Sequence, residues 1–129
     1  MADPIPNAGA ARPVRQLMPS LELSARGMGV QQSFVDVIAR NIANAETTRL
    51  PDGGPYQRQV AVARLSGGAG PLAEVRSDDT PGPMVYDPGH PDANDEGFVR
   101  YPNVDVQTEI VDLMLARRMY EANATVFQA

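Results

Sequence analysis

The stretch from Pro102 to Ala129 most constrains the fold, because its apolar residues have the spacing of one amphipathic helix. They recur in steps of three and four, and Arg117 is the one charged residue in the row. The row consists of Val106, Ile110, Leu113, Arg117, Tyr120, Ala124 and Phe127. Helices in water gain most of their stability by packing such a face, so this stripe requires a partner surface.

A second long helix is predicted over residues 18–46. Pro19 and Ser20 favour a start there, since Ser caps helices and Pro is tolerated in a first turn. Gly27 and Gly29 interrupt it and indicate a bend or the close approach of another helix. Its apolar row is Leu21, Met28, Val35, Ile38, Ile42 and Ala45. We expect the two terminal helices to pair with each other and with neighbouring subunits.

Between the helices, residues 47–102 lose the helical period. Pro51 to Pro55 is a strong turn signal, with two glycines between two prolines. Alternating residues then predict a strand from Tyr56 to Leu65. Shorter strands are expected at residues 72–76, 84–86 and 98–101. The middle of the chain is therefore interpreted as a small, loop-rich β insert.

The composition favours an elongated or assembled structure over a large packed core. Only 5% of the 129 residues are aromatic, whereas the chain has 11 Gly and 12 Pro. Residues 1–17 are rich in Ala and Pro without periodicity, which predicts a disordered tail. We expect an elongated α+β fold in which helices 18–46 and 103–129 pair as a coiled-coil-like layer, with the β insert between them.

Charge and residue usage exclude several function classes. The net charge of −5 argues against nucleic acid and anionic membrane surfaces as partners. All 11 basic residues are Arg and Cys is absent, which excludes lysine Schiff bases and thiolate sites. No apolar run approaches the ~20 residues needed to cross a bilayer. The N-terminal residues also lack the apolar core of a cleaved signal peptide.

The loop around His90 is the strongest candidate for metal chemistry, because Asp92, Asn94 and Glu96 alternate there. Their spacing does not match a calcium-binding EF loop, so we interpret the segment as a polar turn whose side chains bond nearby backbone. No serine-hydrolase motif accompanies this single His. We therefore expect no catalytic residue, no cofactor and no metal.

Two arginines stand out in the last helix. Arg117 lies in the apolar row, so its burial would require a carboxylate partner or a snorkelled head. We expect an interhelix or intersubunit salt bridge, with Asp36, Glu46 or a neighbour's carboxylate as partner. Arg118 is expected on a solvated face.

Seven segments, in this order along the chain, together carry a family resemblance. They lie at residues 39–48 (ARNIANAETT), 51–58 (PDGGPYQR), 86–94 (YDPGHPDAN), 97–99 (GFV), 102–106 (PNVDV), 109–114 (EIVDLM) and 118–127 (RMYEANATVF). The set resembles the rod and hook axial proteins of the bacterial flagellum, and among them the C-type proximal rod subunits of the basal body. It covers about residues 17–127.

The resemblance implies a structural protein without catalytic activity. Its terminal helices would line the central export channel, and its copies would assemble helically with other proximal rod proteins into a shaft that transmits torque. It also implies a periplasmic position between the membrane-ring adaptor and the distal rod, and export by the flagellar type III apparatus without a cleaved signal. The family's last helix continues about three turns beyond the position of Ala129, and its tail before Leu17 is shorter.

The two rows and the resemblance give a set of candidate assembly residues. From the first helix they are Met28, Val35, Ile38, Asn41, Ile42 and Asn44. From the last helix they are Val106, Ile110, Leu113, Met114, Arg117, Tyr120, Asn123 and Phe127. Since a charge cannot be buried unpaired, Ile110→Asp or Leu113→Asp is expected to abolish assembly.

Three functions compete at this point. The first is a structural rod subunit, and the second is a helical adaptor or secreted binding module that uses the same apolar rows on another partner. The third is a small metal-dependent enzyme, which would need His90 for its activity. Loss of motility in a strain without the gene would favour the first over the second, and a silent His90→Ala substitution would exclude the third.

Overall fold

A computed structural model describes residues 14–128 of the chain, and the side chains of residues 21–125 apart from Ser24 and Ala69. The elements follow in the order α1 (Val14–Ala43), β1 (Gln59–Leu65), η1 (Gly67–Ala69), β2 (Pro71–Ser77), β3 (Met84–Tyr86), β4 (Phe98–Arg100) and α2 (Val106–Gln128). The fold is α+β with two helices and small antiparallel sheets, as the sequence predicts.

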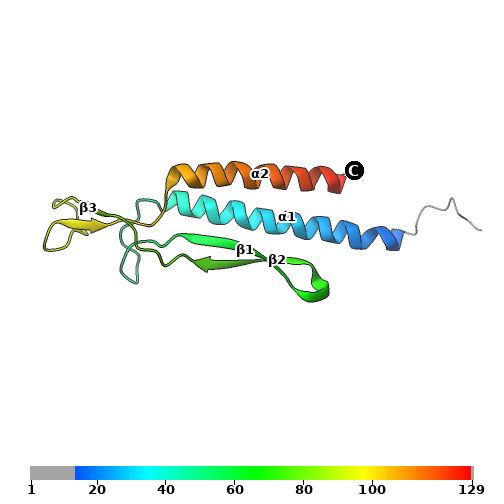
Figure 1. Cartoon of the computed structure of the whole chain (residues 1–129), viewed down its shortest axis with the longest axis horizontal. Helices are drawn as coiled ribbons and strands as arrows, with labels where there is room; N and C mark the ends of the chain where they lie inside the picture. The colour runs from blue at the N-terminus through cyan, green and yellow to red at the C-terminus, as the bar shows by residue number, and fades with distance from the viewer. Residues whose placement is uncertain (1–13, 129) are drawn as a thin grey trace, which may run out of the picture.

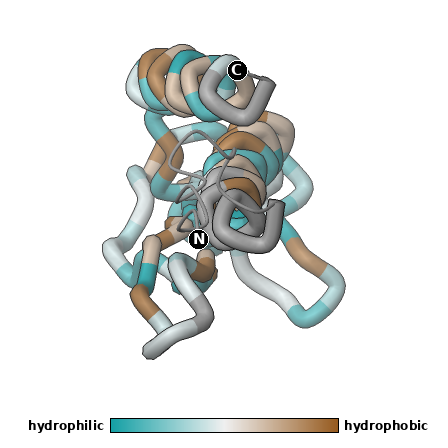
Figure 2. The backbone as a smooth tube through the Cα atoms, turned by 90° about the vertical axis from the view of Figure 1, so that its right-hand side faces the viewer, coloured by the Kyte–Doolittle hydropathy of each residue, from teal (hydrophilic) through white to brown (hydrophobic). Residues whose placement is uncertain are grey.

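The helix α1 lies in the middle of the molecule. The helix α2 runs antiparallel along one side of it, and the hairpin of β1 and β2 covers another side (Figure 1). The strands β3 and β4 lie beyond the end of the helices where α1 ends and α2 begins (Figure 1). Seen along the helices, the two helices lie in the upper part of the molecule and most of the β and loop segments lie below them (Figure 2).

The first helix differs from its predicted boundaries at both ends. Residues 14–17, which the sequence assigned to a tail, belong to α1, while the rest of that predicted tail lies outside the described residues. At the other end α1 stops at Ala43 rather than residue 46. The amide of Asn44 makes the last i→i−4 bond, to the carbonyl of Arg40 at 3.1 Å, which also accepts a bond from the Asn44 side-chain amide at 2.9 Å. The amide of Ala45 bonds instead to the carbonyl of Ile42, three residues back, at 3.3 Å, so the chain leaves the helix in a turn.

The second helix begins three residues later than predicted, at Val106 rather than at residue 103. Asp105 acts as its N-cap, since its carboxylate accepts a hydrogen bond from the backbone amide of Gln107 at 3.1 Å. The same carboxylate accepts a bond from the Thr108 hydroxyl at 3.1 Å. Residues 102–105 therefore form the loop that precedes α2 and are not part of its first turn.

The hairpin pairs β1 with β2 in antiparallel register, from Gln59 opposite Ser77 to Leu65 opposite Pro71. The predicted strand at Tyr56 to Leu65 is confirmed except at its start. Tyr56 donates its backbone amide to the carbonyl of Thr47 at 2.9 Å, and the amide of Arg58 is taken by Asn103. The Arg58 carbonyl still accepts a bond from the amide of Asp78 at 2.8 Å, but its own amide is bonded to Asn103, so the regular ladder begins at Gln59.

The strands β3 and β4 form a second, separate two-stranded sheet, with Met84 opposite Arg100 and Tyr86 opposite Phe98. Their positions are those the sequence predicts, apart from Tyr101, which lies just after β4. Val99 is fully buried, and the rings of Tyr86 and Phe98 meet edge to face with centroids 5.3 Å apart. We call residues 79–101, which contain this sheet, the β arm.

The hydrophobic core is small, as the composition predicts. Its main part lies where α1 meets its neighbours, and the buried side chains there are Val30 and Val37 of α1, Ala61 of β1 and Ala116 of α2. Gly27 lies at the contact of the two helices, because a Cβ built on it would stand 3.6 Å from the side-chain amide of Asn123. Within residues 14–128, neither helix is apolar enough over its length to cross a membrane.

Candidate functional site

The most buried polar side chains of the described part belong to Asn41 of α1 and Glu109 of α2, which are 0% and 1% exposed. They meet Tyr56 and Arg58, which precede β1. We call these four residues the polar junction. It lies at the end of the helix pair nearest the β arm, where α1 ends and α2 begins.

Asn41 uses every hydrogen-bonding position of its side chain. Its oxygen accepts bonds from the Tyr56 hydroxyl at 2.7 Å and from the backbone amide of Gln59 at 2.9 Å. Its amide nitrogen donates to the carbonyl of Gln59 at 2.8 Å and to Glu109 at 3.4 Å. The side chain thus pairs with both backbone groups of Gln59, as a neighbouring strand would, and attaches α1 to the start of β1.

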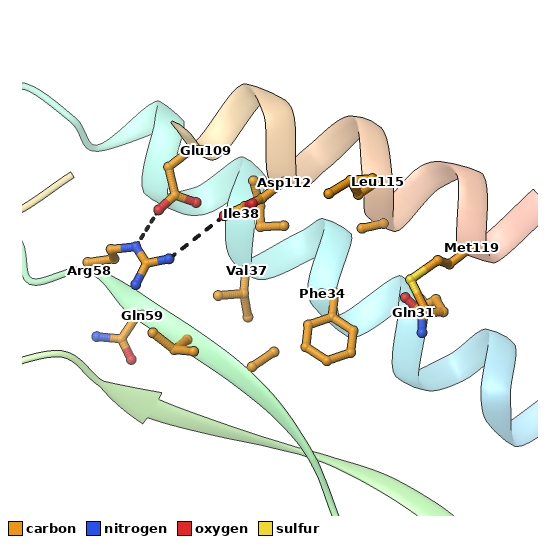
Figure 3. Close-up of a pocket in the computed structure, with 13 residues that line it drawn as sticks. Gln31, Phe34, Val37, Ile38, Arg58, Gln59, Glu109, Asp112, Leu115 and Met119 are labelled. Atoms are coloured by element: carbon orange, nitrogen blue, oxygen red, sulfur yellow. Dashed lines mark hydrogen bonds and ion pairs between the residues drawn. The ribbon is translucent and has the colours of Figure 1, made fainter. Parts of the chain in front are cut away.

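Glu109 forms an ion pair with Arg58 through one carboxylate oxygen (Figure 3). Its other carboxylate oxygen accepts the bond from Asn41. The Arg58 guanidinium also lies 3.6 Å from the carboxylate of Asp78 and 4.0 Å from that of Asp112. Its hydrogen bond to Glu109 raises the pKa of Arg58 above the ordinary value, although burial acts in the opposite direction. The buried carboxylate is therefore paired and hydrogen-bonded, which is the condition for its burial.

Tyr56 is nearly buried beside this ion pair. Burial raises the pKa of its phenol, the charge of Arg40 lowers it, and the charge of Glu109 raises it further. The phenol therefore stays protonated to a higher pH than a free tyrosine, and it keeps donating its hydrogen bond to Asn41.

Two further links fix the base of the β arm beside the polar junction. Asn103 accepts a bond from the amide of Arg58 at 2.7 Å and donates to the carbonyl of Asp78 at 2.9 Å. Gly82 passes so close to the segment after β4 that a Cβ on it would stand 1.9 Å from the carbonyl oxygen of Tyr101. The chain entering the arm and the chain leaving it therefore cross in contact.

The structure distributes the predicted assembly residues over three environments. Asn41 is buried in the polar junction. Half-buried residues are Met28, Val35, Ile38, Ile42 and Asn44 near or within α1, and Leu113, Tyr120 and Asn123 on α2. Exposed residues are Val106, Ile110, Met114 and Arg117. The side chain of Phe127 lies outside the described residues.

The buried face of α2 is turned by about one residue from the row that the sequence suggests. Glu109 and Ala116 occupy its centre, whereas Ile110 is 45% exposed. The shift arises because the polar junction draws an acidic residue inward, and residues seven apart lie on nearly the same side of a helix. Val106 and Ile110, the first residues of the predicted apolar row, therefore lie beside the buried face of α2 and not on it.

Arg117 does not form the interhelix salt bridge that its place in the row suggests. It is exposed, and no carboxylate of the described residues lies within ion-pair distance of it. A pairing with Asp36 or Glu46 of the same chain is therefore wrong, while a neighbour's carboxylate stays a prediction. Arg118 is exposed, as expected.

An apolar groove of about 330 Å³ runs between α1, α2 and β1 (Figure 3). Phe34 and Ile38 line it from α1, Ala61 from β1, and Leu115 and Met119 from α2. The Arg58–Glu109 pair and Asp112 close one end. Leu115 and Met119 are more than half exposed, so the groove has an apolar rim that faces outward.

Sequence reasoning missed Tyr56, Arg58 and Glu109 as a site. A signal existed for Glu109, because it shares the α2 face of Ala116 and Asn123, the residues that point at α1. Nothing local marks its partner, since Arg58 is separated from it by 51 positions.

The loop around His90 is a polar turn, as interpreted. The ring nitrogen Nδ1 of His90 accepts a bond from the amide of Asp92 at 3.0 Å, and Asn94 accepts from the amides of Glu96 and Phe98. Asp92 accepts a bond from the Thr48 hydroxyl at 2.6 Å and pairs with Arg49 at 3.7 Å. In the part of the chain that the structure describes, no cluster of metal-ligating side chains is present.

Comparison with known proteins gives consistent matches. The family model described as "Flagellar basal body rod FlgEFG protein C-terminal" matches residues 95–129. The flagellar basal-body rod protein FlgC of Borreliella burgdorferi is 36% identical over 88% of this chain and 90% of its own length. FlgC of Bacillus subtilis is 36% identical over 85% and 88%, and FlgC of Aquifex aeolicus is 38% identical over 84% of each chain.

Proposed function

The chain belongs to the FlgC family of flagellar basal-body rod proteins, and on this premise we propose how its parts serve the rod. It is a structural subunit of the flagellar basal body and not an enzyme, and it assembles with other rod components. Its similarity to rod proteins over most of its length carries this conclusion. The alternative of a free-standing helical adaptor is not favoured by any of these relatives.

The two helices would form the inner axial part of the rod, with residues 18–46 and 103–129 pairing as a coiled-coil-like layer that encloses the export channel. The exposed apolar side chains of α2 support this arrangement. Ile110, Met114, Leu115 and Met119 are each about half exposed, which leaves apolar surface on several sides of one helix. Neighbouring helices in a tube would remove that surface from water.

The partners would be further copies of this chain, other proximal rod proteins, the membrane-ring adaptor at one end and the distal rod at the other. The candidate assembly residues of α1 and α2 would make these contacts. We place the chain in the periplasmic rod and propose export by the flagellar type III apparatus without a cleaved signal.

The polar junction supports a role in transmitting torque. It joins α1, α2 and the segment before β1 through buried hydrogen bonds and an ion pair, and Asn103 extends it to the base of the β arm. Directional bonds at this point would keep the angle between the inner helices and the outer β part constant while the shaft turns.

Deletion of the gene in the source organism tests the function. We expect loss of motility and basal bodies without an assembled rod, and expression of the wild-type chain from a second locus should restore both. Normal flagella in the deletion strain would contradict the proposal.

A further inference from the structure

The helix α2 carries apolar side chains on two opposite flanks. Each residue turns a helix by about 100°. The buried face of α2 is centred on Glu109 and Ala116. Ile110 and Met114 lie about a quarter turn or more from it in one direction. Leu115 and Met119 lie about a quarter turn from it in the other direction. Val106 and Arg117 extend the first flank, and we call Val106, Ile110, Met114 and Arg117 the stripe. The second flank is the rim of the apolar groove.

The charges on the two flanks are complementary. The stripe ends in Arg117, which has no carboxylate within ion-pair distance among the described residues. The groove is bordered by Asp112, whose carboxylate is 40% exposed and lies 4.0 Å from an Arg58 guanidinium that is already bonded to Glu109. Asp112 thus presents negative charge at the groove, and Arg117 presents positive charge at the stripe.

We propose that the stripe of one copy docks into the groove of the next copy of this chain, with Arg117 directed to Asp112 of the neighbour. This inference rests on the proposed rod function. The two surfaces are different and lie on opposite sides of α2, so each copy can use both at once. Such a head-to-tail contact propagates from copy to copy as a ring or an open helical array, whereas a contact between two identical surfaces closes as a dimer.

Cysteine cross-linking tests the contact, because the chain contains no Cys of its own. Cells of the source organism would carry two copies of the gene, one with Met114→Cys and a tag, the other with Leu115→Cys. Basal bodies are isolated, oxidised and analysed for disulfide-linked dimers. We expect a tagged–untagged heterodimer when both variants are present, and no dimer when either is present alone.

Thr125→Cys is the control, since Thr125 is also exposed on α2 but lies about 15 Å along the helix from both test positions. Paired with either variant it should give no dimer. Homodimers of Met114→Cys alone would overturn the proposal in favour of a two-fold contact. Motile cells with assembled rods and no heterodimer would also overturn it while leaving the rod function intact. Cells that build normal rods without this chain would instead reject the function itself.

Discussion

At the scale of single residues, the polar junction concentrates more directional bonding than any other part of the described chain. Asn41 satisfies four hydrogen bonds, and Glu109 shares its carboxylate between Arg58 and Asn41. Each of these bonds is costly to break because the groups are buried. A buried polar group without a partner has given up its hydrogen bonds to water and gained none in return.

Glu109→Gln should lower the free energy of unfolding by about 1–3 kcal/mol. A neutral glutamine would bind Arg58 more weakly than the carboxylate does. If the glutamine oxygen faced Arg58, the glutamine amide nitrogen would face the amide nitrogen of Asn41, and two hydrogen-bond donors would then oppose each other. Urea unfolding of the purified chain measures the change. Glu74→Gln is the control, because that carboxylate pairs with Arg64 on the exposed hairpin surface, and no measurable change is expected there. Equal losses in both variants would contradict the assignment.

The raised pKa of Tyr56 predicts a fall in stability at alkaline pH. The unfolded chain ionises near pH 10, whereas the folded chain holds the Tyr56 proton to higher pH. The stabilisation is therefore complete below about pH 10 and is lost as the pH rises through the folded-state value. Tyr56→Phe should cost about 1 kcal/mol at pH 8 and show a shallower decline above pH 10 in urea titrations. An unchanged decline would exclude Tyr56 as its source.

At the scale of elements, the periodicity of the sequence predicts both helices and all four strands, because these depend on local apolar spacing and turn residues. The boundaries depend on other interactions. Asp105 sets the start of α2, Asn44 closes α1, and tertiary bonds to Tyr56 and Arg58 delay β1. The burial of Glu109 was not predictable, since an acidic residue in a helix is normally exposed and its partner is distant in sequence.

The rotated buried face of α2 separates the effects of two substitutions. Ile110→Asp should change the unfolding free energy of the isolated chain by no more than about 0.5 kcal/mol, because Ile110 is on the surface. Leu113→Asp should lower it by about 1–3 kcal/mol, because Leu113 is half-buried beside Ala116. Both should abolish motility. Denaturation curves and swimming assays distinguish the two, and retained motility in either variant would refute its place in the assembly surface.

The crossing at the base of the β arm requires glycine at position 82. Gly82→Ala would drive a Cβ into the Tyr101 carbonyl and separate the two crossing segments. We expect a loss of about 1–3 kcal/mol or more, measured by thermal unfolding. Gly89→Ala in the same arm should be tolerated, since its nearest atom would be 4.0 Å away. If Gly82→Ala melts like the wild type, the crossing is looser than described.

At the scale of the whole molecule, the chain has a helix–hairpin part and a β arm that make few direct contacts between their elements. The helix α1 packs on α2 and on the hairpin, while β3 and β4 pack mainly on each other. Besides the polar junction and the crossing, the link between Thr48 and Asp92 holds the arm in place. The sequence analysis groups residues 47–102 as one insert, whereas in the structure the hairpin packs on α1 and only the β arm stands apart. The links to the arm could not be predicted, because each joins segments that are distant in the sequence.

Thr48→Val keeps the side-chain shape and removes the hydroxyl that Asp92 accepts. We expect faster amide hydrogen exchange in β3 and β4, with unchanged exchange in β1 and β2, because local opening depends on the contacts of each part. Hydrogen exchange read by mass spectrometry measures both. Thr125→Val, which removes an exposed bond within α2, should leave the arm unaffected. Equal acceleration in the two sheets would show that they open as one unit.

The central position of α1 has a consequence for how such chains diverge. Its buried side chains are enclosed between α2 on one side and the hairpin on another. A change of volume at Val37 must therefore be absorbed by both layers, whereas a change on the outer side of α2 meets only solvent or a neighbouring subunit. Substitutions at the buried positions of α1 should therefore accumulate slowly and together with compensating changes in α2 and the hairpin. Substitutions on the outer side of α2 should meet no such constraint from within the chain.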